Sequence, residues 1–203
     1  MTDDVTKLDR ADRIGLYIAI GLAVAAIGLV GWGSAQRLAE VAPGHDISVL
    51  VPLSGEQAAL PQGPEGAPVT VDVETATVVV ADPSPATLFA LWAEPIVLFL
   101  AVAAGMIVAS KFILRVARGR AFEKGTARLV FIGASILAGA WFIGAILTNM
   151  TTNGALSAIS DYSYDSTIFA ADLSPFMWIL VLSAVGGALQ LGERLRRDTE
   201  GLV

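Results

Sequence analysis

The residues that could do chemistry in this chain gather in two polar stretches. Arg115–Arg128 (RVARGRAFEKGTAR) carries five basic residues around one large apolar residue, Phe122. Asn149–Asp172 is acidic and contains Tyr162 and Tyr164. The first stretch suits an anionic lipid surface or a protein partner. The second suits a cation or, as an ordinary solvated loop, lets its tyrosines touch lipid headgroups. Both patterns indicate binding rather than catalysis.

The side chains needed for the common catalytic and metal centres are absent or isolated in the sequence. There is no Cys, and His45 is the single His, so cysteine-based and multi-histidine metal sites are excluded. The nucleophile-elbow, HExxH and phosphate-loop patterns are also absent. We therefore expect no catalytic residue, no metal site and no cofactor, and a protein that is not an enzyme.

Composition places the chain among the membrane proteins. Of its 203 residues, 55% are apolar and only 16% are charged, whereas soluble domains have about 25% charged residues. A bilayer core about 30 Å thick requires about 20 apolar residues in a helix, and backbone groups in lipid must be paired within their own segment. The sequence therefore predicts four transmembrane helices. They are residues 14–32, 94–114, 129–148 and 173–191.

The distribution of basic residues predicts the orientation of the spans. Every Lys and Arg except Arg37 lies in or beside residues 1–13, 115–128 or 192–203. These three segments are predicted to be cytoplasmic, whereas residues 33–93 and 149–172 are predicted to lie on the other side. We expect a multi-pass protein of the cytoplasmic (inner) membrane with both termini inside. The net charge of −6 argues against direct binding of nucleic acid.

Residues 33–93 are predicted to form a small β-rich element between the first two spans. Asp46–Leu53 and Val69–Val80 are rich in β-branched residues, and the second alternates apolar with polar side chains. Residues 54–68 read as a turn-rich connector. Two strands alone are marginally stable in water, so we expect them to rest on the outer helix ends or on a partner. The predicted fold class is an all-α integral membrane protein, a four-helix transmembrane bundle with this β-element added.

Two prolines define the predicted entry into the second span. Pro85 suits the first position of a short interfacial helix over Ser84–Ala93. Pro95 is expected to separate that helix from the span.

The basic stretch holds the candidate site. Gly119 and Gly125 interrupt it, and Thr126 is placed to cap the third helix. The candidate contacts for a partner protein or for lipid are Arg118, Gly119, Arg120, Phe122 and Lys124. The alternative is a loop that only fixes topology through its charges, with Phe122 in the headgroup layer.

Small residues recur at four-residue spacing in the spans, where they allow close approach of neighbouring helices. The pairs are Gly21/Ala25, Ser135/Gly139, Ala140/Gly144, Ser183/Gly187 and Ala188/Gly192. We expect them to hold the four helices together, with self-association into a homo-oligomer as the alternative. On this basis, Leu at Gly139 or Gly187 is expected to disturb the bundle.

Two short segments carry a resemblance. Gly119-Arg120-Ala121-Phe122 lies between the second and third spans, and Gly192-Glu193-Arg194-Leu195 opens a tail that closes on Leu202-Val203. In these segments the chain resembles the bacterial four-span membrane family known only as domain of unknown function 2975. The resemblance covers residues 94–203 and the first span and leaves residues 33–93 unmatched. Many members are encoded beside a small helix-turn-helix regulator, which implies a membrane partner for a transcription factor and no catalytic residue.

The sequence thus favours a non-enzymatic regulatory or accessory protein of the lipid bilayer that acts with a cytoplasmic partner. One alternative is a small transporter or channel component, for which the spans offer few polar groups. The candidates are Ser135, Thr148, Ser183 and Gln190. Another alternative is a structural subunit of a larger membrane complex.

Overall fold

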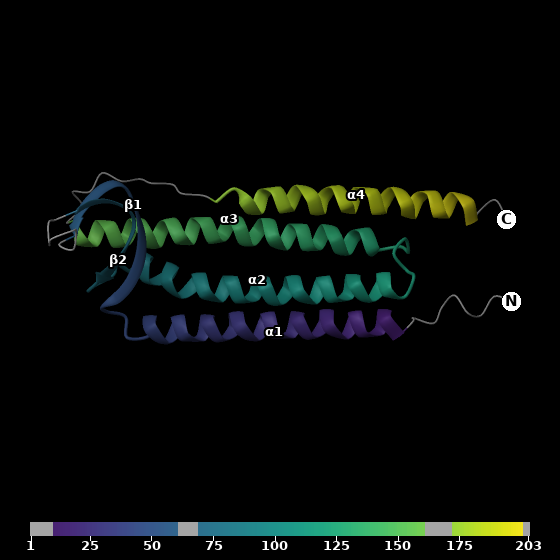
Figure 1. Ribbon diagram of the computed structural model, residues 1–203, viewed down its shortest axis with the longest axis horizontal. Helices are drawn as coiled ribbons and strands as arrows, with labels where there is room; N and C mark the ends of the chain where they lie inside the picture. The colour runs from purple at the N-terminus through teal and green to yellow at the C-terminus, as the bar shows by residue number, and fades with distance from the viewer. Residues whose placement is uncertain (1–9, 61–68, 161–171, 201–203) are drawn as a thin grey trace. The chain divides into compact units, whose positions relative to one another are not determined.

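The computed structural model describes residues 10–60, 69–160 and 172–200, which form four helices and two strands (Figure 1). The elements in chain order are α1 (Arg10–Val41), β1 (Ile47–Leu60), β2 (Val69–Val80), α2 (Pro85–Ala117), α3 (Thr126–Ile159) and α4 (Ser174–Glu200). Four long apolar helices pack together, and a two-stranded antiparallel hairpin follows α1 and precedes α2 in the chain. The predicted fold class is confirmed.

The chain divides into two units. The first, which we call the helix unit, comprises Met1–Gln36, Pro95–Ala145 and Ala171–Val203. The second, the hairpin unit, comprises Arg37–Glu94 and Ile146–Ala170.

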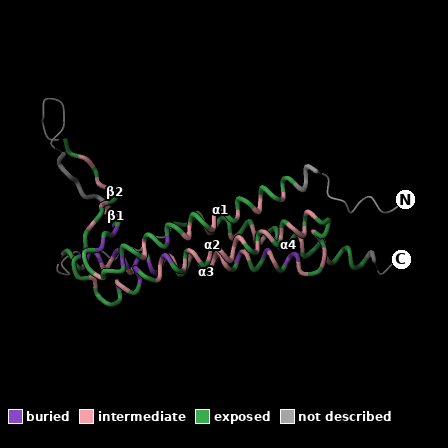
Figure 2. The backbone as a smooth tube through the Cα atoms, turned by 90° about the horizontal axis from the view of Figure 1, so that it is seen from below, coloured by how far each residue is buried: buried purple, intermediate pink, exposed green. Residues whose placement is uncertain are grey.

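The helices have the length and the surface of membrane spans. The stretches long and apolar enough to cross a bilayer are Ile14–Val41, Pro85–Ala117, Thr126–Ile159 and Ser174–Asp198. Large apolar side chains are exposed along them, such as Leu29, 74% exposed, and Phe142, 62% exposed. Exposed residues recur along the helices (Figure 2). Apolar surface on this scale is unfavourable in water but costs nothing against lipid tails. The chain is a multi-pass membrane protein.

Consecutive helices of the helix unit approach each other where a glycine faces a large side chain. The pairs are Gly31 of α1 with Phe99 of α2, Gly133 of α3 with Val108 of α2, and Gly186 of α4 with Phe131 of α3. A Cβ added at Gly31 or Gly186 would lie 3.1 Å from the facing ring, so both positions favour glycine.

The expectation that Gly139 and Gly187 lie in helix contacts is wrong. A Cβ added at either position would meet nothing within 4 Å, and the same holds for Gly21 and Gly144. The physical reason is rotational phase: adjacent residues on a helix point about 100° apart, so Gly186 faces Phe131 while Gly187 points elsewhere. Four-residue spacing does not specify which side of a helix meets a neighbour.

The hairpin rests on helix ends inside the hairpin unit. The strands pair antiparallel from Ile47 opposite Val80 to Leu60 opposite Val69. The buried apolar core joins one face of the strands to α1, α2 and α3. Its members are Val41, Ile47, Val49, Val51, Val80, Leu91, Ala155 and Leu156. The prediction that the strands rest on helix ends is confirmed, and burial of these side chains supplies what two isolated strands lack.

The first strand is longer than predicted. β1 continues through residues 54–60, which were expected to form a connector, because the backbone of residues 56–60 pairs with β2. These residues lack β-branched side chains, so local propensity gave no sign of the strand. The register shifts between Pro52 and Glu56, and Pro52 has no N–H to donate to a ladder. Residues 61–68 of the predicted connector lie outside the described part.

Pro85 begins α2 as predicted, but Pro95 does not interrupt the helix. The Thr87 N–H donates to Oγ of Ser84 at 3.2 Å, which caps the first turn. Pro95 lies inside a continuous helix that runs to Ala117, so the expected short helix is the first part of α2. Proline removes one backbone hydrogen bond, and long membrane helices tolerate that loss because neighbouring helices support them.

The predicted loop at 149–172 is partly helical. α3 runs on to Ile159, and its hydroxyl groups bond back to the helix. Oγ1 of Thr151 donates to the Leu147 carbonyl at 2.9 Å. Side chains that suggested a loop are therefore satisfied by their own helix. Tyr162 and Tyr164 lie outside the described residues.

Candidate functional site

The turn between α2 and α3 has a defined backbone shape. The Gly119 N–H donates to the Val116 carbonyl and the Arg120 N–H to the Arg115 carbonyl, both at 2.9 Å. This pair of bonds is a Schellman motif, which requires a left-handed residue after the helix end. Gly119 supplies it with φ +69°, and Gly125, directly before α3, also has a positive φ of +92°. Both glycines are needed because other residues are strained at positive φ.

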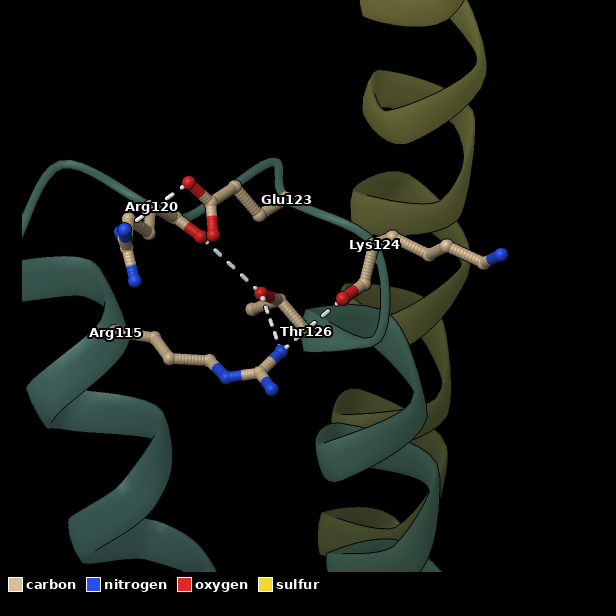
Figure 3. Close-up of polar contacts among 5 residues, drawn as sticks. All are labelled: Arg115, Arg120, Glu123, Lys124 and Thr126. Carbon is tan, nitrogen blue, oxygen red and sulfur yellow. Dashed lines mark hydrogen bonds and ion pairs between the residues drawn. The ribbon is translucent and has the colours of Figure 1, made fainter.

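Side chains close this loop on itself (Figure 3). Nη1 of Arg115 donates to the Lys124 carbonyl and to Oγ1 of Thr126, each at 3.4 Å. The Thr126 hydroxyl in turn donates to the Arg120 carbonyl at 3.2 Å. Nε of Arg120 forms an ion pair with Glu123 at 3.3 Å. The basic stretch is thus an organised loop.

The loop also contacts the last turns of α4. The Phe122 ring lies against Gly192, where an added Cβ would come within 2.5 Å of its Cδ1 atom. Oε1 of Glu193 accepts the Ala127 N–H at 2.8 Å and so caps the start of α3. Thr126 was expected to be this cap. Its hydroxyl instead donates to the Arg120 carbonyl, and the capping group is the carboxylate of Glu193 on α4.

The structure separates the five candidate residues by role. Gly119 shapes the turn, and Arg120 is paired with Glu123. Arg118 is exposed. Phe122, 50% exposed, and Lys124 line a pocket of about 160 Å³ together with residues of α4. The full lining is Phe122, Glu123, Lys124, Glu193, Arg196 and Arg197. We call these six residues the loop–tail site.

Of these six residues, Phe122 and Lys124 were named from the sequence as candidate contacts, whereas the three α4 residues were not. Glu193, Arg196 and Arg197 are ordinary members of a charged helix end, and nothing in their spacing indicates a contact with residues far earlier in the chain. The segment Gly192–Leu195 was singled out only through the family resemblance, without a link to Phe122.

In the acidic stretch before α4, the structure describes hydrogen bonds at Asp172. Oδ1 of Asp172 accepts the Ser174 N–H at 2.9 Å, and its backbone carbonyl accepts Nε1 of Trp141 at 2.7 Å. The hydrogen bonds from the Ser174 backbone and side chain hold the pKa of Asp172 below its usual value. Asp161 and Asp165 lie outside the described residues. Among those described, no three His, Cys, Asp or Glu side chains are placed to hold a metal ion.

The chain matches no protein-family model, no curated protein and no solved structure.

Proposed function

We propose that this chain is a non-enzymatic membrane protein of regulatory or accessory type that docks a cytoplasmic protein partner at the loop–tail site. The observation that carries the proposal is Phe122: half of its surface is open although its loop is fully organised. An exposed aromatic ring on a rigid support is the usual anchor of a protein interface.

The order of the loop supports docking over a purely topological role. Positive charge alone sets the orientation of a membrane protein. That role requires neither the Schellman motif at Gly119, nor the Arg115 hydrogen bonds, nor the cap from Glu193. A surface that is ordered before binding loses less conformational entropy when a partner arrives.

The family resemblance suggests the kind of partner. Its two segments, Gly119–Phe122 and Gly192–Leu195, meet where the Phe122 ring contacts Gly192. We propose that the partner is the one that the resemblance to domain of unknown function 2975 implies, a small helix-turn-helix regulator held at the membrane.

The polar groups of the helices favour this proposal over a transporter. Oγ1 of Thr148 donates to Oε1 of Glu94, and Oγ of Ser183 donates to the Ile179 carbonyl, both at 2.7 Å. These hydroxyls are used within the protein, which fits helix packing better than a polar path.

Photo-crosslinking in cells tests the proposal directly. A photoreactive residue at Arg118, exposed beside Phe122 in sequence, is expected to capture one cytoplasmic protein. Phe122→Ala is expected to lower recovery of that protein about fourfold to tenfold, because full burial of a Phe contributes about 1.5–3 kcal/mol and half of this ring is still exposed before binding. The matched control is Phe176→Ala, which removes a ring of similar exposure, 46%, from the other end of α4. Unchanged recovery with Phe122→Ala would contradict the proposal.

A further inference from the structure

The pocket of the loop–tail site has a charge pattern that the docking of a protein does not explain. The loop contributes Phe122, Glu123 and Lys124, and α4 contributes Glu193, Arg196 and Arg197. Its volume of about 160 Å³ is several times the roughly 30 Å³ that one water molecule occupies in the liquid.

Both carboxylates of the pocket are already engaged. Glu123 is paired with Arg120. Glu193 accepts the Ala127 N–H at the first turn of α3, where the helix dipole places a partial positive charge. Their negative charges are therefore largely offset by groups outside the lining.

Lys124 and Arg197, two of the three cations of the pocket, are not offset in the same way. Within the described residues, neither the Lys124 ammonium nor the Arg197 guanidinium forms an ion pair with a carboxylate. Both residues line the same small pocket, so an anion of the size of a phosphate group in this pocket would lie beside both. Lys and Arg donate charge-assisted hydrogen bonds to phosphate oxygens, which are about twice as strong as neutral ones.

We propose that the loop–tail pocket binds the phosphate group of an anionic phospholipid, held between Lys124 and Arg197. The apolar surroundings favour lipid over free phosphate. Phe122, which lines the pocket, is 50% exposed, and α4, which supplies half of the lining residues, is long and apolar enough to cross a membrane. Basic pockets beside apolar helix surface are typical sites for anionic headgroups. The lipid site does not depend on the docking of a protein partner.

Binding of a short-chain lipid to the purified full chain tests this site. The probe is dihexanoyl phosphatidylglycerol, titrated into protein held in an uncharged detergent at about 0.15 M salt. Replacing Lys124 and Arg197 by Gln is expected to weaken binding about thirtyfold, since each charge near an anionic group is worth about fivefold.

A matched control removes one Lys charge and one Arg charge outside the pocket. Lys111 and Arg194 are exposed and do not line the pocket. The double change Lys111→Gln and Arg194→Gln is expected to alter binding less than about threefold, because neither side chain lines the pocket and salt screens charges at a distance. The charge-conserving double change Lys124→Arg and Arg197→Lys is expected to retain binding, which separates loss of charge from loss of folding.

Three outcomes would overturn the lipid site. Equal weakening by both Gln pairs would mean diffuse attraction without a pocket. Equal binding of dihexanoyl phosphatidylcholine would mean that the anionic charge is not selected. Displacement of the lipid by an equal concentration of inorganic phosphate would assign the pocket to free phosphate. None of these results bears on the crosslinking at Arg118, so the two proposals fail separately.

Discussion

At the level of single residues, the contact between Phe122 and Gly192 depends on the missing side chain at position 192. Phe122 and Lys124 were selected from the sequence because an aromatic ring among basic residues is unusual in a polar loop. Their counterparts on α4 could not be selected, because a contact between residues 122 and 192 leaves no trace in local spacing. The wrong expectation at Gly139 and Gly187 has a related cause, since the spacing of small residues does not give the rotation of a helix about its axis.

Gly192→Ala is expected to destabilise the loop–tail site, whereas Gly187→Ala is not. Both changes add one methyl group to α4. At 192 it would come within 2.5 Å of the Phe122 ring, while at 187 it would meet nothing within 4 Å. Overpacking of this kind costs about 1–3 kcal/mol. Thermal unfolding in detergent measures the stability of both variants, and hydrogen exchange over residues 118–128 measures the order of the loop. Equal stability and equal exchange in the two variants would show that the position of the Phe122 ring does not depend on its contact with Gly192.

At the level of elements, hydrophobic pattern predicted which segments are helices and strands but not where they end. Four apolar stretches and two runs of β-branched residues were sufficient to predict four helices and two strands. The helix break predicted at Pro95 was wrong. A proline lowers helix propensity in any sequence, but a membrane helix continues through it when neighbouring helices support it. The strand over residues 54–60 was missed because it forms by pairing with β2 and not by its own propensity.

The start of α4 is expected to loosen in acid. Because hydrogen bonds from Ser174 lower the pKa of Asp172, its carboxylate stabilises the folded state above the ordinary pKa of about 3.9. That contribution is lost as pH falls from this value through the lowered pKa of the folded state.

Asp172→Asn tests this dependence, because the amide keeps an oxygen acceptor and does not titrate. The variant is expected to show a flatter fall in stability below about pH 4 than the native chain. Hydrogen exchange at the first turns of α4 measures it. An unchanged acid profile in the variant would assign the loss to other carboxylates.

At the level of the whole molecule, the two polar ends of the helices differ in charge. The turn between α2 and α3 and the last turns of α4 carry most of the basic residues, while the hairpin and the residues before α4 are acidic. Basic residues are retained on the cytoplasmic side during insertion. The same charges that hold an anionic phosphate in the loop–tail site therefore also predict the direction in which the chain crosses the membrane.

Cysteine accessibility tests that direction. The native chain contains no Cys, so an introduced thiol is the only one present. Thr70 on β2 and Arg118 in the loop are both exposed in the folded protein, so burial does not bias the comparison. Thr70→Cys is expected to react with a membrane-impermeant maleimide in intact cells, whereas Arg118→Cys is expected to react only after the membrane is opened. Labelling of Arg118→Cys from outside would reverse the orientation and, with it, place the loop–tail site out of reach of any cytoplasmic partner.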